Sequence, residues 1–232
     1  MKKILAICSK QIKDTMRNKM VLFQYTLMPL MAATLAALMP ESLYDTGDIN
    51  PVFATMYTGM VPLSSMTSVI AEERENGTLR CLRMANVTGI QYILGIGSCL
   101  LLQSLFGIVV FAVLGGYRRI ELIQFGSICI IGVLASLILG AIIGIAAKNL
   151  MAATSIAASV SVLLAFLPMM STFDEKLSQL SNFLYTQQIQ NMMTELGETP
   201  FTLERVVILG ANLTTLCFVF TLVYRKKGLR DQ

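Results

Sequence analysis

Six long stretches without a charged residue constrain this chain more than any other feature. They lie at positions 20–39, 52–71, 93–116, 122–147, 150–170 and 206–224. A helix needs about 20 apolar residues to cross the hydrocarbon core of a bilayer. Because lipid cannot satisfy open backbone groups, each stretch is predicted to be helical; the stretches do not alternate as barrel strands do. We therefore expect an all-α, polytopic membrane protein with six transmembrane helices, forming a single domain over residues 1–232.

Composition agrees with this class and narrows the chemistry. Only 14% of the 232 residues are charged, against about 25% in soluble domains. The chain has no histidine, which excludes a His-based metal site or a Ser–His pair. Its five cysteines form no C-x-x-C pair and are interpreted as small buried hydrophobes. No catalytic residue, metal site or nucleic-acid partner is predicted.

The distribution of basic residues predicts the orientation. Lys148 and Asn149 separate the fourth and fifth stretches and are interpreted as a tight turn. With six spans, fourteen lysines and arginines fall on the side of the two termini and four on the other. Because basic residues accumulate in cytoplasmic loops, both termini are expected in the cytoplasm, with the protein in the plasma membrane.

Residues 1–19 are expected to form an amphipathic helix at the inner membrane interface. Apolar side chains recur at three- and four-residue steps, and lysines and arginines fall mostly elsewhere around the helix. The apolar positions are Ile4, Leu5, Cys8, Ile12 and Met16. An alternative is a basic anchor that only fixes the topology.

Residues 171–205 are too long for a plain loop and are expected to form two short outer helices. The first carries an apolar stripe at Leu177, Leu180 and Leu184, and Gly197 and Pro200 follow the second. The second stripe comprises Ile189, Met192, Met193 and Leu196. The alternative is a cap that merely covers the bundle.

Two stripes of small residues predict close helix packing. The first comprises Gly132, Ser136, Gly140 and Gly144, and the second Ala153, Ala157, Ser161 and Ala165. Because the connecting turn is short, we expect the two faces to meet each other; a dimer seam is the alternative.

A charged segment, residues 72–83, interrupts the apolar sequence. Its acidic and basic residues Glu72, Glu73, Arg74 and Glu75 are expected to extend the second span, and Gly77 is expected to end that helix. Thr78 is a suitable N-cap for a second short helix. That helix would carry Leu79, Leu82 and Arg83. A rigid projection of this kind is one that a cytoplasmic protein can grip.

Glu73 to Leu79, followed by Leu82, resembles the E-R-E-x-G-T-L-x-x-L signature of the type 2 ATP-binding cassette exporter permeases. In that family the signature also follows the second of six spans. The resemblance implies that residues 72–83 couple the permease to a separate ATPase subunit, and that residues 1–19 form the family's connecting helix. Two positions depart from the usual pattern, Asn86 where proline is common and Ile96 where lysine is common.

The rest of the sequence indicates which energy source could drive transport. The chain lacks the GxxxxGK phosphate loop, so ATP would be bound by a partner and the permease itself is not an enzyme. No Asp, Glu, Lys or Arg lies in the six stretches, which argues against an ion-driven carrier. We expect the membrane subunit of a bacterial ATP-driven exporter, paired with a second permease copy as a homodimer or heterodimer and surrounded by lipid. The resemblance implies a drug, peptide, lipid or glycan as cargo. The alternative is a non-transporting membrane scaffold or assembly factor.

Overall fold

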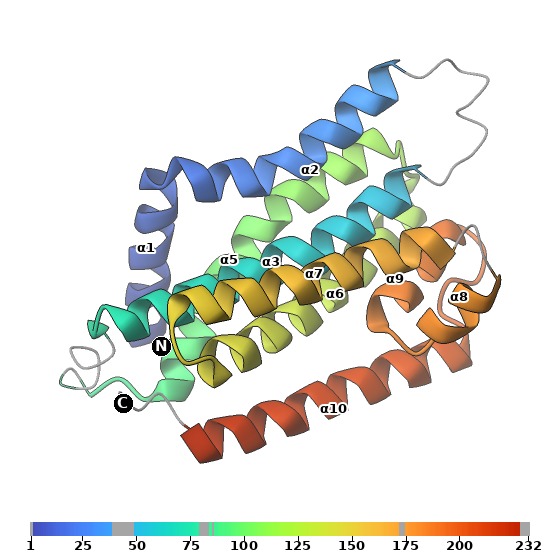
Figure 1. Ribbon diagram of the computed structural model, residues 1–232. Helices are drawn as coiled ribbons and strands as arrows, with labels where there is room; N and C mark the ends of the chain where they lie inside the picture. The colour runs from blue at the N-terminus through green and yellow to red at the C-terminus, as the bar shows by residue number, and fades with distance from the viewer. Residues whose placement is uncertain (1, 39–48, 79–83, 85, 172–174, 228–232) are drawn as a thin grey trace.

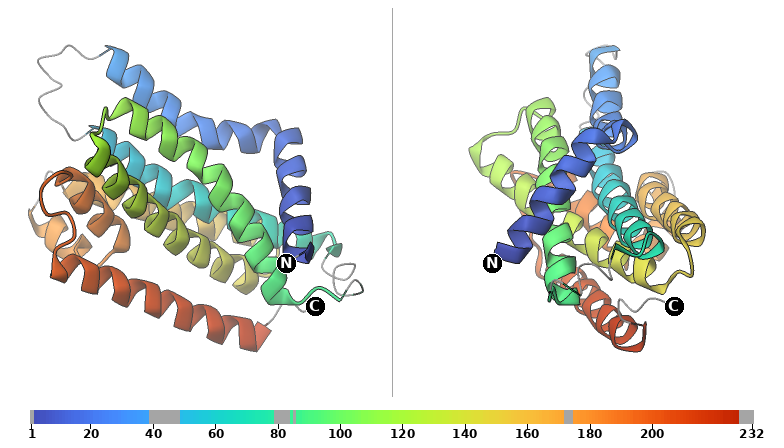
Figure 2. Two further views of the ribbon diagram at one scale, coloured as in Figure 1. Left: turned by 180° about the vertical axis from the view of Figure 1, so that it is seen from behind. Right: turned by 90° about the vertical axis from the view of Figure 1, so that its left-hand side faces the viewer.

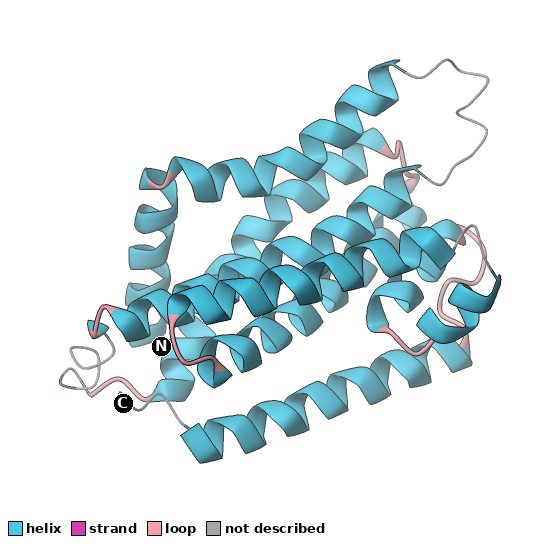
Figure 3. Cartoon of the chain, viewed as in Figure 1, coloured by secondary structure: helices cyan, strands magenta, loops and turns pink. Residues whose placement is uncertain are grey.

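The computed structural model describes residues 2–38, 49–78, 84, 86–171 and 175–227. Long helices dominate this part of the chain, and it contains no strand (Figures 1 and 3). In chain order the helices are α1 (Lys2–Arg17), α2 (Lys19–Leu38), α3 (Ile49–Glu75), α5 (Gly89–Leu114), α6 (Arg119–Ala146), α7 (Leu150–Ser171), α8 (Glu175–Ser181), α9 (Tyr185–Thr194) and α10 (Leu203–Lys227). The prediction of an all-α protein is confirmed.

Five helices are long and apolar enough to cross a membrane: α2, α5, α6, α7 and α10. The second apolar stretch, residues 52–71, is also helical and lies within α3. However, the mean hydropathy of α3 is lower than that of these five helices, because serine and threonine occupy many of its positions. These hydroxyl residues are Thr55, Thr58, Ser64, Ser65, Thr67 and Ser68.

Helix α3 lies at the centre of the bundle, which explains how it accommodates its polar residues (Figure 1). Tyr57, Leu63 and Ile70 are fully buried. The Thr67 hydroxyl donates a hydrogen bond of 3.0 Å to the carbonyl of Gly140 in α6. Hydroxyl groups that face other helices can find such partners, whereas in lipid they find only carbonyls of their own helix.

The small-residue stripes on α6 and α7 do not meet each other as expected. A Cβ atom on Gly140 would lie 2.5 Å from the carbonyl oxygen of Leu63, so α6 packs its stripe on α3. Ser161 of α7 also contacts α3, with 3.2 Å between its hydroxyl oxygen and that of Ser64. The turn between α6 and α7 is confirmed, but α3 occupies the space facing both stripes.

Helix α1 lies across one end of the bundle and turns sharply into α2 (Figure 2). A Cβ atom on Gly95 of α5 would lie 2.9 Å from Ile7 Cγ2, so the two helices approach closely. The amphipathic helix is confirmed, but its buried face differs from the predicted stripe. Ile7, Cys8, Gln11 and Thr15 are the buried residues. Leu5, Ile12 and Met16 are exposed.

The two short helices expected within residues 171–205 are α8 and α9. Helix α9 is inserted into the bundle, and Ile189, Met192 and Met193 of its predicted stripe are buried. Its Tyr185 hydroxyl lies 2.8 Å from the Ser136 hydroxyl of α6. The first stripe is less buried, because Leu180 of α8 is exposed. Gly197 has a φ of +89° and follows the end of α9, as predicted.

Candidate coupling site

The charged segment that resembles the exporter signature begins at the end of α3. Helix α3 runs through Glu75, and the N–H of Asn76 still donates to the carbonyl of Glu72 at 2.9 Å. Gly77 then adopts a φ of +68°, a left-handed conformation that glycine accepts without strain. The predicted extension of the helix and its stop at Gly77 are therefore confirmed. Leu79, Leu82 and Arg83, with the second short helix they would form, lie outside the described residues.

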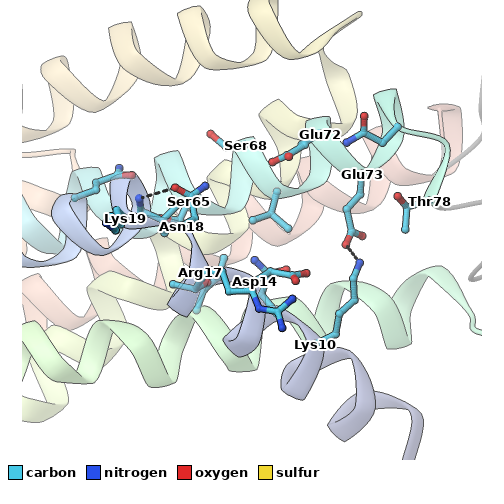
Figure 4. Close-up of a pocket in the computed structure, with 17 residues that line it drawn as sticks. Lys10, Asp14, Arg17, Asn18, Lys19, Ser65, Ser68, Glu72, Glu73 and Thr78 are labelled. Carbon is cyan, nitrogen blue, oxygen red and sulfur yellow. Dashed lines mark hydrogen bonds and ion pairs between the residues drawn. The ribbon is translucent and has the colours of Figure 1, made fainter.

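Glu73 connects α3 to α1. Its Oε1 atom lies 2.6 Å from the Lys10 ammonium nitrogen, and its side chain is only 13% exposed (Figure 4). A partly buried pair of this kind is screened less by salt than a surface pair. Helix α1 is thus tied to the start of the charged segment.

Arg74 connects α3 to α6. Its Nη1 atom donates a hydrogen bond of 2.9 Å to the carbonyl of Ile145, and Nη2 donates to the carbonyl of Ala147. The last carbonyl groups of a helix have no partner within the helix. The planar guanidinium fork satisfies two of them with one positive charge, which the helix C-terminus favours.

Glu75 connects α3 to α7. Its Oε2 atom accepts a hydrogen bond of 2.8 Å from the backbone N–H of Leu150, the first residue of α7. Asn149 adds a second cap, since its side-chain oxygen accepts from the N–H of Ala152 at 2.8 Å. A carboxylate at a helix N-terminus is stabilised by the helix dipole.

Three consecutive residues of the signature therefore bind three different helices, and we call Glu73, Arg74 and Glu75 the clamp. Of the predicted site residues described, Glu72 and Glu75 are exposed, and Glu73, Arg74, Gly77 and Thr78 are half-buried. Sequence reasoning missed the clamp's partners. It also missed Lys227 of α10, which donates to the carbonyl of Ala146 beside the Arg74 contacts.

A pocket of about 650 Å³ lies between α1, the start of α2 and the end of α3 (Figure 4). Charged and polar side chains form most of its wall. The pocket-lining charges are Lys10, Asp14, Arg17, Lys19, Glu72 and Glu73. The sequence analysis did not predict this pocket.

The described residues contain no group of three or more side chains suited to hold a metal ion. Of the cysteines they include, Cys8, Cys99 and Cys129 are buried thiols, as predicted, whereas Cys217 is exposed. No protein-family model and no curated protein matches the chain. The functional argument therefore depends on the geometry of the clamp and of the pocket beside it.

Proposed function

We propose that the chain is the membrane subunit of an ATP-driven exporter whose ATPase is a separate protein. The observation that carries this proposal is the clamp. A segment resembling the coupling signature of type 2 exporter permeases stands where a push on it would reach α1, α6 and α7 through direct hydrogen bonds. A loop that only connected two spans would not need these contacts.

Six crossings are the arrangement that best fits the helices. The chain enters through α1 and leaves through α10 at the same end of the bundle (Figure 1). Returning to that end requires an even number of crossings, so the buried α3 joins the five apolar helices as the sixth. This end carries α1, Arg74, Lys148 and the basic residues that close α10. Because basic residues accumulate on the cytoplasmic side of a membrane, this end would face the cytoplasm, and the protein would span the plasma membrane.

The mechanism divides the signature into two parts. Glu72, Gly77 and Thr78 flank the clamp and would contact the ATPase, while the clamp, which is bonded to three other helices, passes the movement to the bundle. A second permease copy, identical or related, would complete the path for the cargo. An apolar or amphipathic cargo suits helices that carry no charged residue in their central parts.

The test compares two substitutions of Gly77. No atom of the described residues lies within 4 Å of a Cβ atom at this position, so the comparison addresses the backbone conformation. Asparagine tolerates a positive φ, whereas a β-branched valine does not. Together with the ATPase that co-purifies with the protein, Gly77→Asn should keep transport-stimulated ATP turnover and Gly77→Val should lose it.

Two controls make the result decisive. Gly97→Val also meets open space, within α5, and should leave turnover unchanged. Equal turnover of Gly77→Val and the wild type would remove the coupling role and favour a scaffold. Orientation is tested in a cysteine-free variant, where an impermeant thiol reagent added outside the cell should label Arg119→Cys but not Glu72→Cys.

A further inference from the structure

We propose that Cys8 of α1 and Cys99 of α5 are a pair of thiols that a peroxide converts into a disulfide bond, which cross-links the two helices. Formation of this bond does not depend on export, whereas its effect on ATP turnover rests on the proposed function. Three observations support the pair: the contact between the two thiols, the close crossing of α1 and α5, and a hydrogen-bond donor beside Cys99.

The two thiols meet inside the interface between α1 and α5. The Cys8 thiol lies within hydrogen-bonding contact of the Cys99 thiol. Cys99 is fully buried, and Cys8 is 8% exposed. A single buried cysteine behaves as a small apolar side chain. Two thiols in contact have a further reaction open to them, because the sulfur of one can be attacked by the other once it is oxidised.

The backbones of α1 and α5 come close beside this pair. A disulfide needs Cα atoms about 4.4–6.8 Å apart, so it can bridge two helices only where their backbones approach closely. Gly95, one turn before Cys99, provides such an approach, because a Cβ atom there would lie 2.9 Å from Ile7 Cγ2. Ile7 directly precedes Cys8, so the point of closest packing and the two thiols belong to the same crossing.

Gln103 holds the other side of the crossing and supplies a donor to the pair. Its Nε2 atom donates a hydrogen bond of 3.0 Å to Thr15 Oγ1 of α1 and lies 3.3 Å from Cys99 Sγ. A hydrogen bond to sulfur favours the thiolate, which is the reactive form of cysteine. Cys99 is therefore suited to attack an oxidised sulfur, while Cys8, the more exposed of the two, meets the oxidant first.

The reaction consumes one molecule of hydrogen peroxide and releases two of water. The Cys8 thiolate attacks a peroxide oxygen and becomes a sulfenic acid, the O–O bond breaks, and the departing hydroxide takes up the proton that Cys8 lost. The Cys99 thiolate then attacks the Cys8 sulfur, the S–O bond breaks, and the second hydroxide takes up the Cys99 proton. Both sulfurs are oxidised, and both peroxide oxygens are reduced. A reducing cytoplasm keeps the pair as thiols until peroxide rises.

The cross-link would fix α1 beside its contact with the clamp. Lys10, two residues after Cys8, forms the ion pair with Glu73. A disulfide at this point prevents α1 from moving relative to α5. Under the proposed function, a push on the clamp moves α1, so the disulfide should stop stimulated ATP turnover.

The test uses the full-length protein in detergent, with the other three cysteines replaced by Cys81→Ala, Cys129→Ala and Cys217→Ala. Hydrogen peroxide is added and then removed with catalase. The protein is denatured, and its free thiols are counted with a maleimide that carries polyethylene glycol. We expect two labelled thiols before oxidation, none after it, and two again after treatment with dithiothreitol. Two free thiols after oxidation would overturn the proposal, as would a sulfinic acid at Cys8 beside a free Cys99 in the mass spectrum.

The matched control exchanges two neighbouring residues of α1, Cys8→Ser together with Ser9→Cys. Ser9 is exposed, so this variant keeps the composition of the chain and moves the thiol away from α5. It should form no intramolecular disulfide under the same treatment. Equal cross-linking of the control would show that the contact between Cys8 and Cys99 is not required, and would refute the pair.

A second measurement separates the thiol pair from the proposed function. With the co-purifying ATPase present, peroxide should abolish stimulated ATP turnover of the protein that keeps Cys8 and Cys99, and dithiothreitol should restore it. Turnover of the exchange variant should not respond to either reagent. A disulfide that forms without loss of turnover would support the thiol pair and would contradict a role for α1 in coupling.

Discussion

Replacing Arg74 by glutamine removes the contact between the clamp and the end of α6. The wild-type guanidinium donates to two carbonyl groups, those of Ile145 and Ala147. A hydrogen bond to a charged group contributes about 1.5–3 kcal/mol. Because the contact is half-buried, water can partly replace it, and we expect Arg74→Gln to lower the free energy of unfolding by about 2–4 kcal/mol. Arg74→Lys should recover about half of the loss, since a single ammonium lacks the fork that reaches both carbonyls.

The measurement is the free energy of unfolding in mixed micelles, titrated with a denaturing detergent and followed by circular dichroism. Arg119→Gln is the control, because Arg119 is exposed and its replacement should change stability by less than about 0.5 kcal/mol. If Arg74→Gln is no more costly than Arg119→Gln, the clamp does not hold α6 in place. The proposed route from the signature to the bundle would then fail as well.

Three further changes test the packing of α6 and the ion pair that follows α9. Gly140→Ala should lose about 1–3 kcal/mol, because its Cβ would lie 2.5 Å from a carbonyl oxygen of α3; Gly126→Ala meets open space and should lose nothing in the same titration. Ser136→Ala should cost about 1–3 kcal/mol, since its hydroxyl donates at 2.6 Å to a buried α3 carbonyl; an unchanged thermal midpoint would contradict this. The hydrogen bond from Arg205 lowers the pKa of Glu195 below its usual value. Its stabilisation, about 0.2–1 kcal/mol for a surface pair, is present above the carboxyl's unfolded pKa and disappears as pH falls through the folded pKa. Glu195→Gln should flatten that acid limb of the stability curve.

The sequence predicted the helices well where a single physical requirement decided the outcome. Long apolar stretches must be helical in lipid, and the stop at Gly77 needed only a residue that tolerates a positive φ. The residues that the clamp binds could not be predicted in this way. Arg74 reaches carbonyls more than seventy positions away, and nothing local in the sequence indicates which helix end will stand beside it.

The small-residue stripes also show that sequence alone does not predict which helices contact each other. Gly140 and Ser161 correctly marked surfaces of close approach. The short turn between α6 and α7 made them neighbours in sequence, but it did not determine which faces would touch. The hydroxyl content of α3 was the missing clue, because a helix rich in serine and threonine is stabilised when other helices surround it.

The central position of α3 has a consequence for biosynthesis. In the six-span arrangement, the ribosome completes α3 at Glu75, and must still add residues 76–146 before α6 is finished. At about 5–20 residues per second, this delay lasts several seconds. During this delay the Gly140 carbonyl that Thr67 binds has not yet been placed beside α3. The nascent α3 therefore depends on the insertion machinery to keep its polar residues away from lipid. Cells with a weakened insertase should therefore degrade this protein while α3 waits for its partner.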